Sequence, residues 1–158
     1  DDSNLHFVLV GQGDLKEEYQ GRLKGLQNVV VGPRIEQHEI PYFLSKCDIL
    51  YLSTKDSRIW DYGQSMNKLV DYMMAGKPVV ASYSGYPSML NESGSGVFVE
   101  TNSTNAIIEG IRKYANLDPV VRSEIGAKGR DWIKEHYNND AVCTRYLDTL
   151  HDLVRNQR

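Results

Sequence analysis

The sequence has few cysteines and histidines and no long apolar run. Cys47 and Cys143 lie far apart and match no metal-binding or redox spacing, as expected in a reducing cytosol. The four histidines are also scattered, and we expect no metal site. No apolar run approaches the length of a membrane-spanning helix, and the acidic start at Asp1 and Asp2 is unlike a signal peptide. We therefore expect a cytoplasmic protein.

The charge balance gives no reason to expect a nucleic-acid partner, because 18 basic and 21 acidic residues leave a net charge of −3. Hydrophobic residues make up 41% of the chain and charged residues 25%, which is ordinary for a soluble globular protein. A chain of 158 residues is about one domain and can bury a substantial core. We find no internal repeat and no linker, and we predict a single domain over residues 1–158.

Residues 60–82 read as a helix followed by a buried strand. Ser65 is placed to cap the helix, Gly76 fits the left-handed position past its end, and Pro78 prevents its continuation. The apolar run at 79–81 then predicts a strand buried on both faces. The apolar residues of the helix recur with the spacing of one buried stripe: Met66, Leu69, Val70, Met73 and Met74.

The alternation of apolar runs and helical patterns predicts an α/β fold: a Rossmann-like open parallel sheet of about five strands with helices on both faces. The strands are expected at residues 6–10, 28–31, 48–52, 79–81 and 96–99. Further helices are expected up to about Lys24, over 36–46, after Pro87, and over about 103–115, 119–136 and 140–153. The inward residues expected in two of them are Ile40, Phe43 and Leu44, and Ile107, Ile108 and Ile111; the last helix carries Cys143, Tyr146, Leu147, Leu150 and Leu153 on one stripe.

Ligands of such sheets bind outside the carboxyl ends of the strands. The Gly11-Gln12-Gly13 turn follows the first strand, but Lys16 stands where a dinucleotide fingerprint has its third glycine. The turn therefore suits either a phosphate or a plain strand-to-helix connection. Free N–H groups around Asn67 and Lys68 would bind a phosphate at the start of the central helix. Asp71, one turn on, is either a solvated carboxylate or an acceptor for hydroxyl groups.

Residues 62–79, YGQSMNKLVDYMMAGKPV, resemble the motif YGxSPNKLxDYMAAGKPV. On this motif the chain resembles the C-terminal half of a GT-B glycosyltransferase of the retaining GT4 group, bacterial cell-surface polysaccharide type. Shorter stretches are similar in register: residues 10–13 to the VGxG turn, residues 45–49 to the strand with ADV, and residues 84–87 to the GGxP loop. The resemblance covers nearly the whole chain.

The resemblance implies metal-independent transfer, with retained configuration, from a nucleotide-sugar donor to a polysaccharide or lipid-linked acceptor; it favours a UDP-linked sugar. Of the family's two acids, the second binds the ribose hydroxyls and falls on Asp71. The first contacts the donor sugar and falls on Gly63, which has no carboxylate. Asp61 stands two residues earlier and is therefore the candidate catalytic acid. The remaining substrate-binding residues implied are Ser65, Met66, Asn67 and Lys68 for the diphosphate, Arg34 for the base, and Gly11, Gly13 and Gly85.

Two family elements are expected outside this sequence: a further strand with a basic pair, and the N-terminal acceptor-binding domain. We therefore expect a fragment that is inactive alone. The prediction leaves open whether the full enzyme associates peripherally with the inner face of the cytoplasmic membrane. The alternative is a non-catalytic nucleotide-binding or interaction module of the same fold. A receiver-like domain would need clustered acids where Gly11-Gln12-Gly13 stands. Trp60 and Tyr62 would either stack on the ligand or pack on their own domain.

Overall fold

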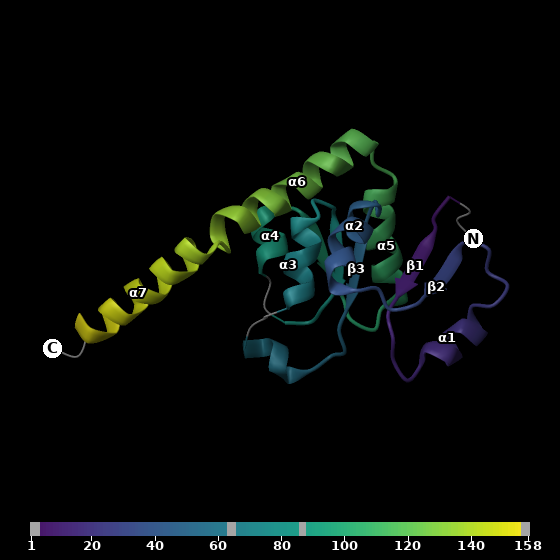
Figure 1. Ribbon diagram of the computed structural model, residues 1–158, viewed down its shortest axis with the longest axis horizontal. Coiled ribbons are helices and arrows are strands. Elements are labelled where there is room, and N and C mark those ends of the chain that lie inside the picture. Colours follow the sequence, from purple (N-terminus) through teal and green to yellow (C-terminus); the bar gives the residue numbers. More distant parts are fainter. Residues whose placement is uncertain (1–3, 63–65, 86–87, 156–158) are drawn as a thin grey trace. The chain divides into compact units, whose positions relative to one another are not determined.

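The computed structural model describes residues 4–62, 66–85 and 88–155. The chain divides into two compact units: an amino-terminal unit, Asp1–Phe43, and a carboxy-terminal unit, Leu44–Arg158. Figure 1 shows the elements of both units.

The amino-terminal unit contains a parallel pair of short strands. Strand β1 (Phe7–Val10) pairs with β2 (Val29–Gly32), so that Phe7 lies opposite Val29. Helix α1 (Lys16–Arg22) connects them, and β2 leads into the 3₁₀ helix η1 (Gln37–Glu39). Helix α2 (Ile40–Ser45) crosses the boundary into the next unit.

The carboxy-terminal unit is built on a three-stranded parallel sheet in the order β3 (Leu50–Ser53), β4 (Val79–Ser82) and β5 (Gly96–Val99). The central strand β4 is buried along its whole length. Helix α5 (Thr104–Ala115) packs closely on one face, since a Cβ at Gly110 would lie 2.9 Å from the Val80 and Val99 side chains. Helix α3 (Asn67–Met74) covers the opposite face of the same sheet and buries Leu69 and Met73 completely (Figure 1).

Three more helices and a 3₁₀ segment complete this unit: η2 (Arg58–Tyr62), α4 (Met89–Ser93), α6 (Pro119–His136) and α7 (Asn139–Arg155). Helix α6 packs on α3 through Gly126, where a Cβ would overlap the carbonyl of Gly76. Helix α7 contacts α6 and buries none of its residues. Within the described ranges, no helix is both long enough and apolar enough to span a membrane.

The predicted strands and helices are confirmed to within a few residues, and every observed strand pairing is parallel. The described strands form one sheet of two strands and another of three. Residues 37–39 form η1, where an α-helix was predicted from residue 36. The left-handed conformation predicted for Gly76 is confirmed by its φ of 68°. Pro119 occupies the first turn of α6, with Asp118 as the N-cap.

Two predictions of buried side chains were wrong. Met74 is 40% exposed because the fully buried stripe of α3 is narrower than predicted and centres on Leu69 and Met73. Ile108 is 39% exposed because Gly110 and Tyr114 form the buried face of α5. The predicted stripe of α7 exists as a helical face, but its residues are exposed. The predicted cap Ser65 lies outside the described residues, and Met66 occupies the N-cap position without a side-chain cap.

Candidate nucleotide-sugar site

The predicted Gly11–Gly13 turn lines a pocket in the amino-terminal unit. The turn leaves β1 and leads into α1, whose Lys16 N–H donates to the carbonyl of Gly13 over 3.1 Å. A Cβ on either glycine would meet no described atom within 4 Å, so the space above the turn is open to a ligand. The pocket has a volume of about 190 Å³ and is lined by Leu9, Val10, Gly11, Gly13, Leu15, Lys16, Tyr19 and Val31.

Arg34 lies just beyond the carboxyl end of β2, in the same unit. Because Val10 pairs with Gly32 in a parallel register, Arg34 and the Gly11–Gly13 turn follow the same edge of this sheet. Its side chain is exposed. A guanidinium at this edge can contact the polar groups of a base or a phosphate.

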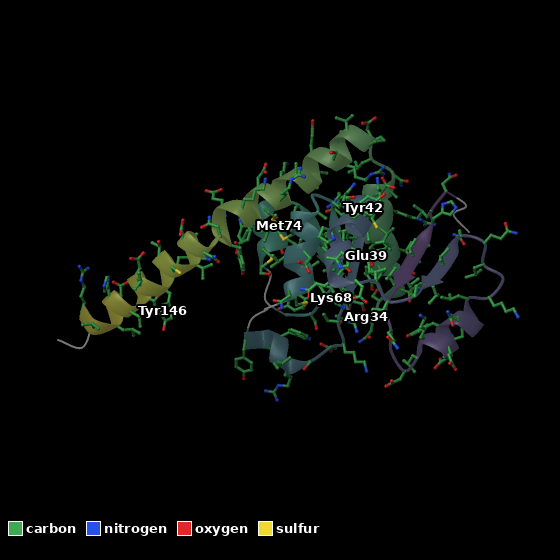
Figure 2. The ribbon with its side chains drawn as sticks, viewed as in Figure 1. Arg34, Glu39, Tyr42, Lys68, Met74 and Tyr146 are labelled. Carbon is green, nitrogen blue, oxygen red and sulfur yellow. The ribbon has the colours of Figure 1, made fainter. Side chains whose placement is uncertain are left out.

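The first turn of α3 presents polar groups in the carboxy-terminal unit. Asn67 and Lys68 open the helix and are exposed, and Figure 2 shows Lys68 at this end of α3. Their backbone N–H groups precede the first helical hydrogen bond, in which Leu69 donates to Met66 over 2.9 Å. Asp71, four residues after Asn67, is also exposed. The end of this helix therefore offers N–H donors, an ammonium group and a carboxylate to an anionic ligand with hydroxyl groups.

The loops that follow β3 and β4 are joined at the carboxyl edge of the sheet. The backbone N–H and hydroxyl of Thr54 both donate to the Ser82 carbonyl over 3.0 Å. Further along the same loops, the Ser84 hydroxyl donates to the Asp56 carboxylate over 2.5 Å. The loop after β3 and the Gly85 loop therefore meet at this edge of the sheet.

Trp60 packs within its own unit. Its ring meets Tyr83 edge to face at 5.8 Å, and its indole N–H donates to the Lys55 carbonyl over 3.0 Å. Tyr62, two residues on, is 88% exposed. The candidate acid Asp61 lies between them in η2 and is exposed. The two aromatic residues therefore differ: Trp60 packs against its own unit, and Tyr62 is exposed to solvent.

Gly85 has a packing role that the sequence did not reveal. A Cβ at this position would lie 2.6 Å from the Trp60 carbonyl oxygen and 2.7 Å from the Tyr83 hydroxyl. The φ of +149° disfavours other residues as well. Tyr83 and its contact with Trp60 were not predicted, because the two residues are 23 positions apart and neither belongs to a recognised motif.

On and beside α3, the pKa values of two groups, Tyr72 and Cys47, are raised. Burial, the Cys47 thiol and the Asp71 carboxylate together raise the pKa of Tyr72. Burial raises the pKa of Cys47, an effect that Lys77 opposes and Asp48 reinforces. Since Asp71 is exposed, its carboxylate is accessible to a ligand.

The predicted residues lie in separate places within the two units. Gly11 and Gly13 share one pocket with Lys16 and Tyr19, which were not predicted. In the other unit, Asp61 and Gly85 lie on joined loops, and Met66, Asn67, Lys68 and Asp71 belong to the start of α3. Gly63 and Ser65 lie outside the described residues. Within residues 4–62, 66–85 and 88–155, no three His, Cys, Asp or Glu side chains cluster as metal ligands would.

Comparison with known proteins gives a family and a fold. Residues 1–116 match the model of the family described as glycosyl transferases group 1. No curated protein sequence matches the chain. Among solved structures, sucrose-phosphate synthase from Thermosynechococcus elongatus is similar, with a TM-score of 0.65 and 17% identity over 94% of this chain and 38% of that chain.

Anabaena HepE, in a structure with UDP and glucose, has a TM-score of 0.63 and 16% identity over 93% of this chain and 40% of that chain. The present chain thus spans about two fifths of each of these proteins. At this level of identity the likeness concerns the fold, which is that of one half of a GT-B glycosyltransferase.

Proposed function

Because the chain belongs to the family of group 1 glycosyl transferases, we propose that it is the donor-binding part of a retaining, GT4-type enzyme that uses a UDP-linked sugar. The acceptor is a polysaccharide or a lipid-linked saccharide, bound by the remainder of the full-length protein. We further propose that the enzyme is bacterial and cytoplasmic, and that it works at the inner face of the cytoplasmic membrane.

One observation carries this proposal: the exposed start of α3, where Asn67 and Lys68 lie in the first turn and Asp71 follows in the next turn. The N–H groups of Asn67 and Lys68 donate to the diphosphate, and the Lys68 ammonium group neutralises part of its charge. Asp71 lies one helical turn further on, where it accepts hydrogen bonds from the ribose hydroxyls. A diphosphate next to a ribose matches this order of groups along the helix.

The other predicted residues have proposed roles, each within its own unit. Asp61, on the loop after β3, contacts the donor sugar and replaces the acid that the family has at the position of Gly63. Arg34 contacts the base, and the Gly11–Gly13 turn lies against the phosphates. The structure of HepE with UDP and glucose supports the choice of a UDP-linked donor. The proposed transfer is metal-independent, with the N–H groups of α3 and the Lys68 ammonium group binding the diphosphate.

The test is the affinity of the full-length protein for UDP, measured by calorimetry for wild type and Asp71→Asn. Asparagine has the same size, but it offers one acceptor oxygen and adds a donor. Losing charge-assisted hydrogen bonds should cost about 1.5–3 kcal/mol, which weakens binding roughly ten- to hundredfold. The melting temperature should stay unchanged, because Asp71 is exposed.

Asp131→Asn is the matched control, since Asp131 is also an exposed aspartate within a helix, α6. It should leave UDP affinity unchanged. If Asp71→Asn binds UDP as tightly as wild type does, Asp71 is a solvated carboxylate and the ribose assignment is wrong. If wild type binds neither UDP nor any sugar in a panel of UDP-glucose, UDP-galactose and UDP-N-acetylglucosamine, the UDP-donor function is wrong.

A further inference from the structure

Tyr83 is anchored in the sheet of the carboxy-terminal unit and reaches into the loop that carries Asp61. It follows β4 directly and is only 5% exposed. Its N–H donates to the Val99 carbonyl over 3.2 Å, and its ring packs on Phe98 with 5.0 Å between centroids. Tyr83 is therefore held by β5 and belongs to the rigid part of this unit.

The hydroxyl of Tyr83 donates to the carbonyl oxygen of Trp60 over 3.3 Å. This carbonyl belongs to the peptide group that joins Trp60 to Asp61. Since a peptide group is planar, holding its oxygen also sets the direction of the Asp61 N–H and the position of the Asp61 Cα. The edge-to-face contact between the Tyr83 and Trp60 rings restrains the same point of the loop.

We propose that Tyr83 is a positioning residue for Asp61, which it holds in place through the Trp60 peptide group. The inference rests on the proposed function, in which Asp61 contacts the donor sugar. Without the Tyr83 hydroxyl, the loop keeps its ties at Thr54 and Asp56 and the bond from the Trp60 indole to Lys55, but none of these bonds holds the Trp60 carbonyl. The carboxylate is then free to sample orientations that miss the sugar.

Gly85 supports the same inference from another part of the chain. A Cβ there would come within 3 Å of both atoms of the hydrogen bond, the Trp60 oxygen and the Tyr83 hydroxyl. A larger residue at position 85 would therefore push the two atoms apart. In this interpretation Gly85 serves the site indirectly, by leaving room for the hydrogen bond that positions Asp61.

In this proposal, two parts of this unit bind different parts of the donor. The start of α3 binds the diphosphate and ribose, while the tie from Tyr83 to Trp60 governs only the sugar contact. A change at Tyr83 should therefore alter the affinity for a UDP-sugar and leave the affinity for UDP unchanged. A general loss of folding would weaken both.

The experiment measures the calorimetric affinity of full-length variants for UDP and for the UDP-sugar that wild type binds most tightly in the panel above. Tyr83→Phe keeps the ring and loses the hydroxyl, and it should weaken UDP-sugar binding about three- to tenfold. Gly85→Ala keeps a tyrosine at position 83 but disturbs the same hydrogen bond, and it should also weaken UDP-sugar binding. Tyr114→Phe is the control: it removes the hydroxyl of another buried tyrosine of this unit, and both affinities should stay at wild-type values.

A double-mutant cycle with Asp61→Asn then tests whether Tyr83 acts through Asp61. If it does, Tyr83→Phe should have no further effect once Asp61 is replaced, so the two changes should not add. Additive effects, or an unchanged UDP-sugar affinity in Tyr83→Phe, would overturn the positioning role while leaving the proposed function intact. Absence of UDP-sugar binding in wild type would instead remove the proposed function, and the role of Tyr83 with it.

Discussion

Strands β4 and β1 are both short and apolar, yet one is buried and the other is exposed. In β4, Val79, Val80 and Ala81 have no exposed surface, whereas in β1 Val8 is 52% exposed. The surroundings of each strand explain the difference. Strand β4 pairs on both sides, and helices α3 and α5 pack on the two faces of its sheet, whereas within its own unit β1 pairs only with β2. Apolar composition thus predicts that a strand forms, while its neighbours decide how much of it leaves water.

The largest expected effect tests this contrast with one substitution in each sheet. Val80→Asp places a carboxylate where no water reaches, and we expect it to lower the free energy of unfolding by more than about 3 kcal/mol. Val30→Asp, at a β2 position that is 58% exposed, should cost less than about 1 kcal/mol. Urea denaturation followed by circular dichroism measures both. Similar losses would show that the two sheets are equally buried in solution.

A smaller effect on stability is expected when two helical glycines are each replaced by alanine. Gly126→Ala in α6 would drive a Cβ into the Gly76 carbonyl, and repacking should cost roughly 1–3 kcal/mol. In Gly21→Ala on α1, the new Cβ meets nothing within 4 Å. Alanine is the better helix former, and this change should stabilise by up to about 1 kcal/mol. Thermal melts of the two variants should therefore shift in opposite directions. A stabilised Gly126→Ala would contradict the close packing of α6 on α3.

The smallest expected effect is a fall in stability at alkaline pH that originates in the carboxy-terminal unit. Burial raises the pKa of Tyr114, and burial, Cys47 and Asp71 raise the pKa of Tyr72. The unfolded chain ionises these phenols first, at their usual pKa of about 10. The free energy of unfolding should therefore be level below that pH and fall as the pH rises through it. Tyr114→Phe should make the fall shallower in denaturation curves between pH 8 and 11. An equally steep fall in this variant would rule out Tyr114 as a source.

Most of the fold was predictable from local patterns. The apolar run at 79–81 indicated a strand buried on both faces, and Gly76 with Pro78 indicated the end of the preceding helix; the structure confirms both. The patterns were less reliable at single positions. Met74 fits the helical stripe, but the face of α3 that meets its neighbours is narrower than the stripe.

The candidate site was predictable where it follows local sequence order. Asn67 and Asp71 are four residues apart, and a helix alone puts them on one face. The same holds for the turn at Gly11 and Gly13. The Asp56–Ser84 hydrogen bond could not be predicted, since it joins residues 28 positions apart through the path of two loops.

By itself, the sequence determined where strands and helices form, because periodicity, caps and turn residues act between neighbours in the chain. It also determined which groups the start of α3 presents, since those follow from helix geometry. The tertiary structure decided that Trp60 packs on Tyr83 while Tyr62 faces solvent, and that position 85 has no room for a side chain. Those outcomes depend on contacts between distant residues, which exist only once parallel pairing has brought the ends of β3 and β4 together.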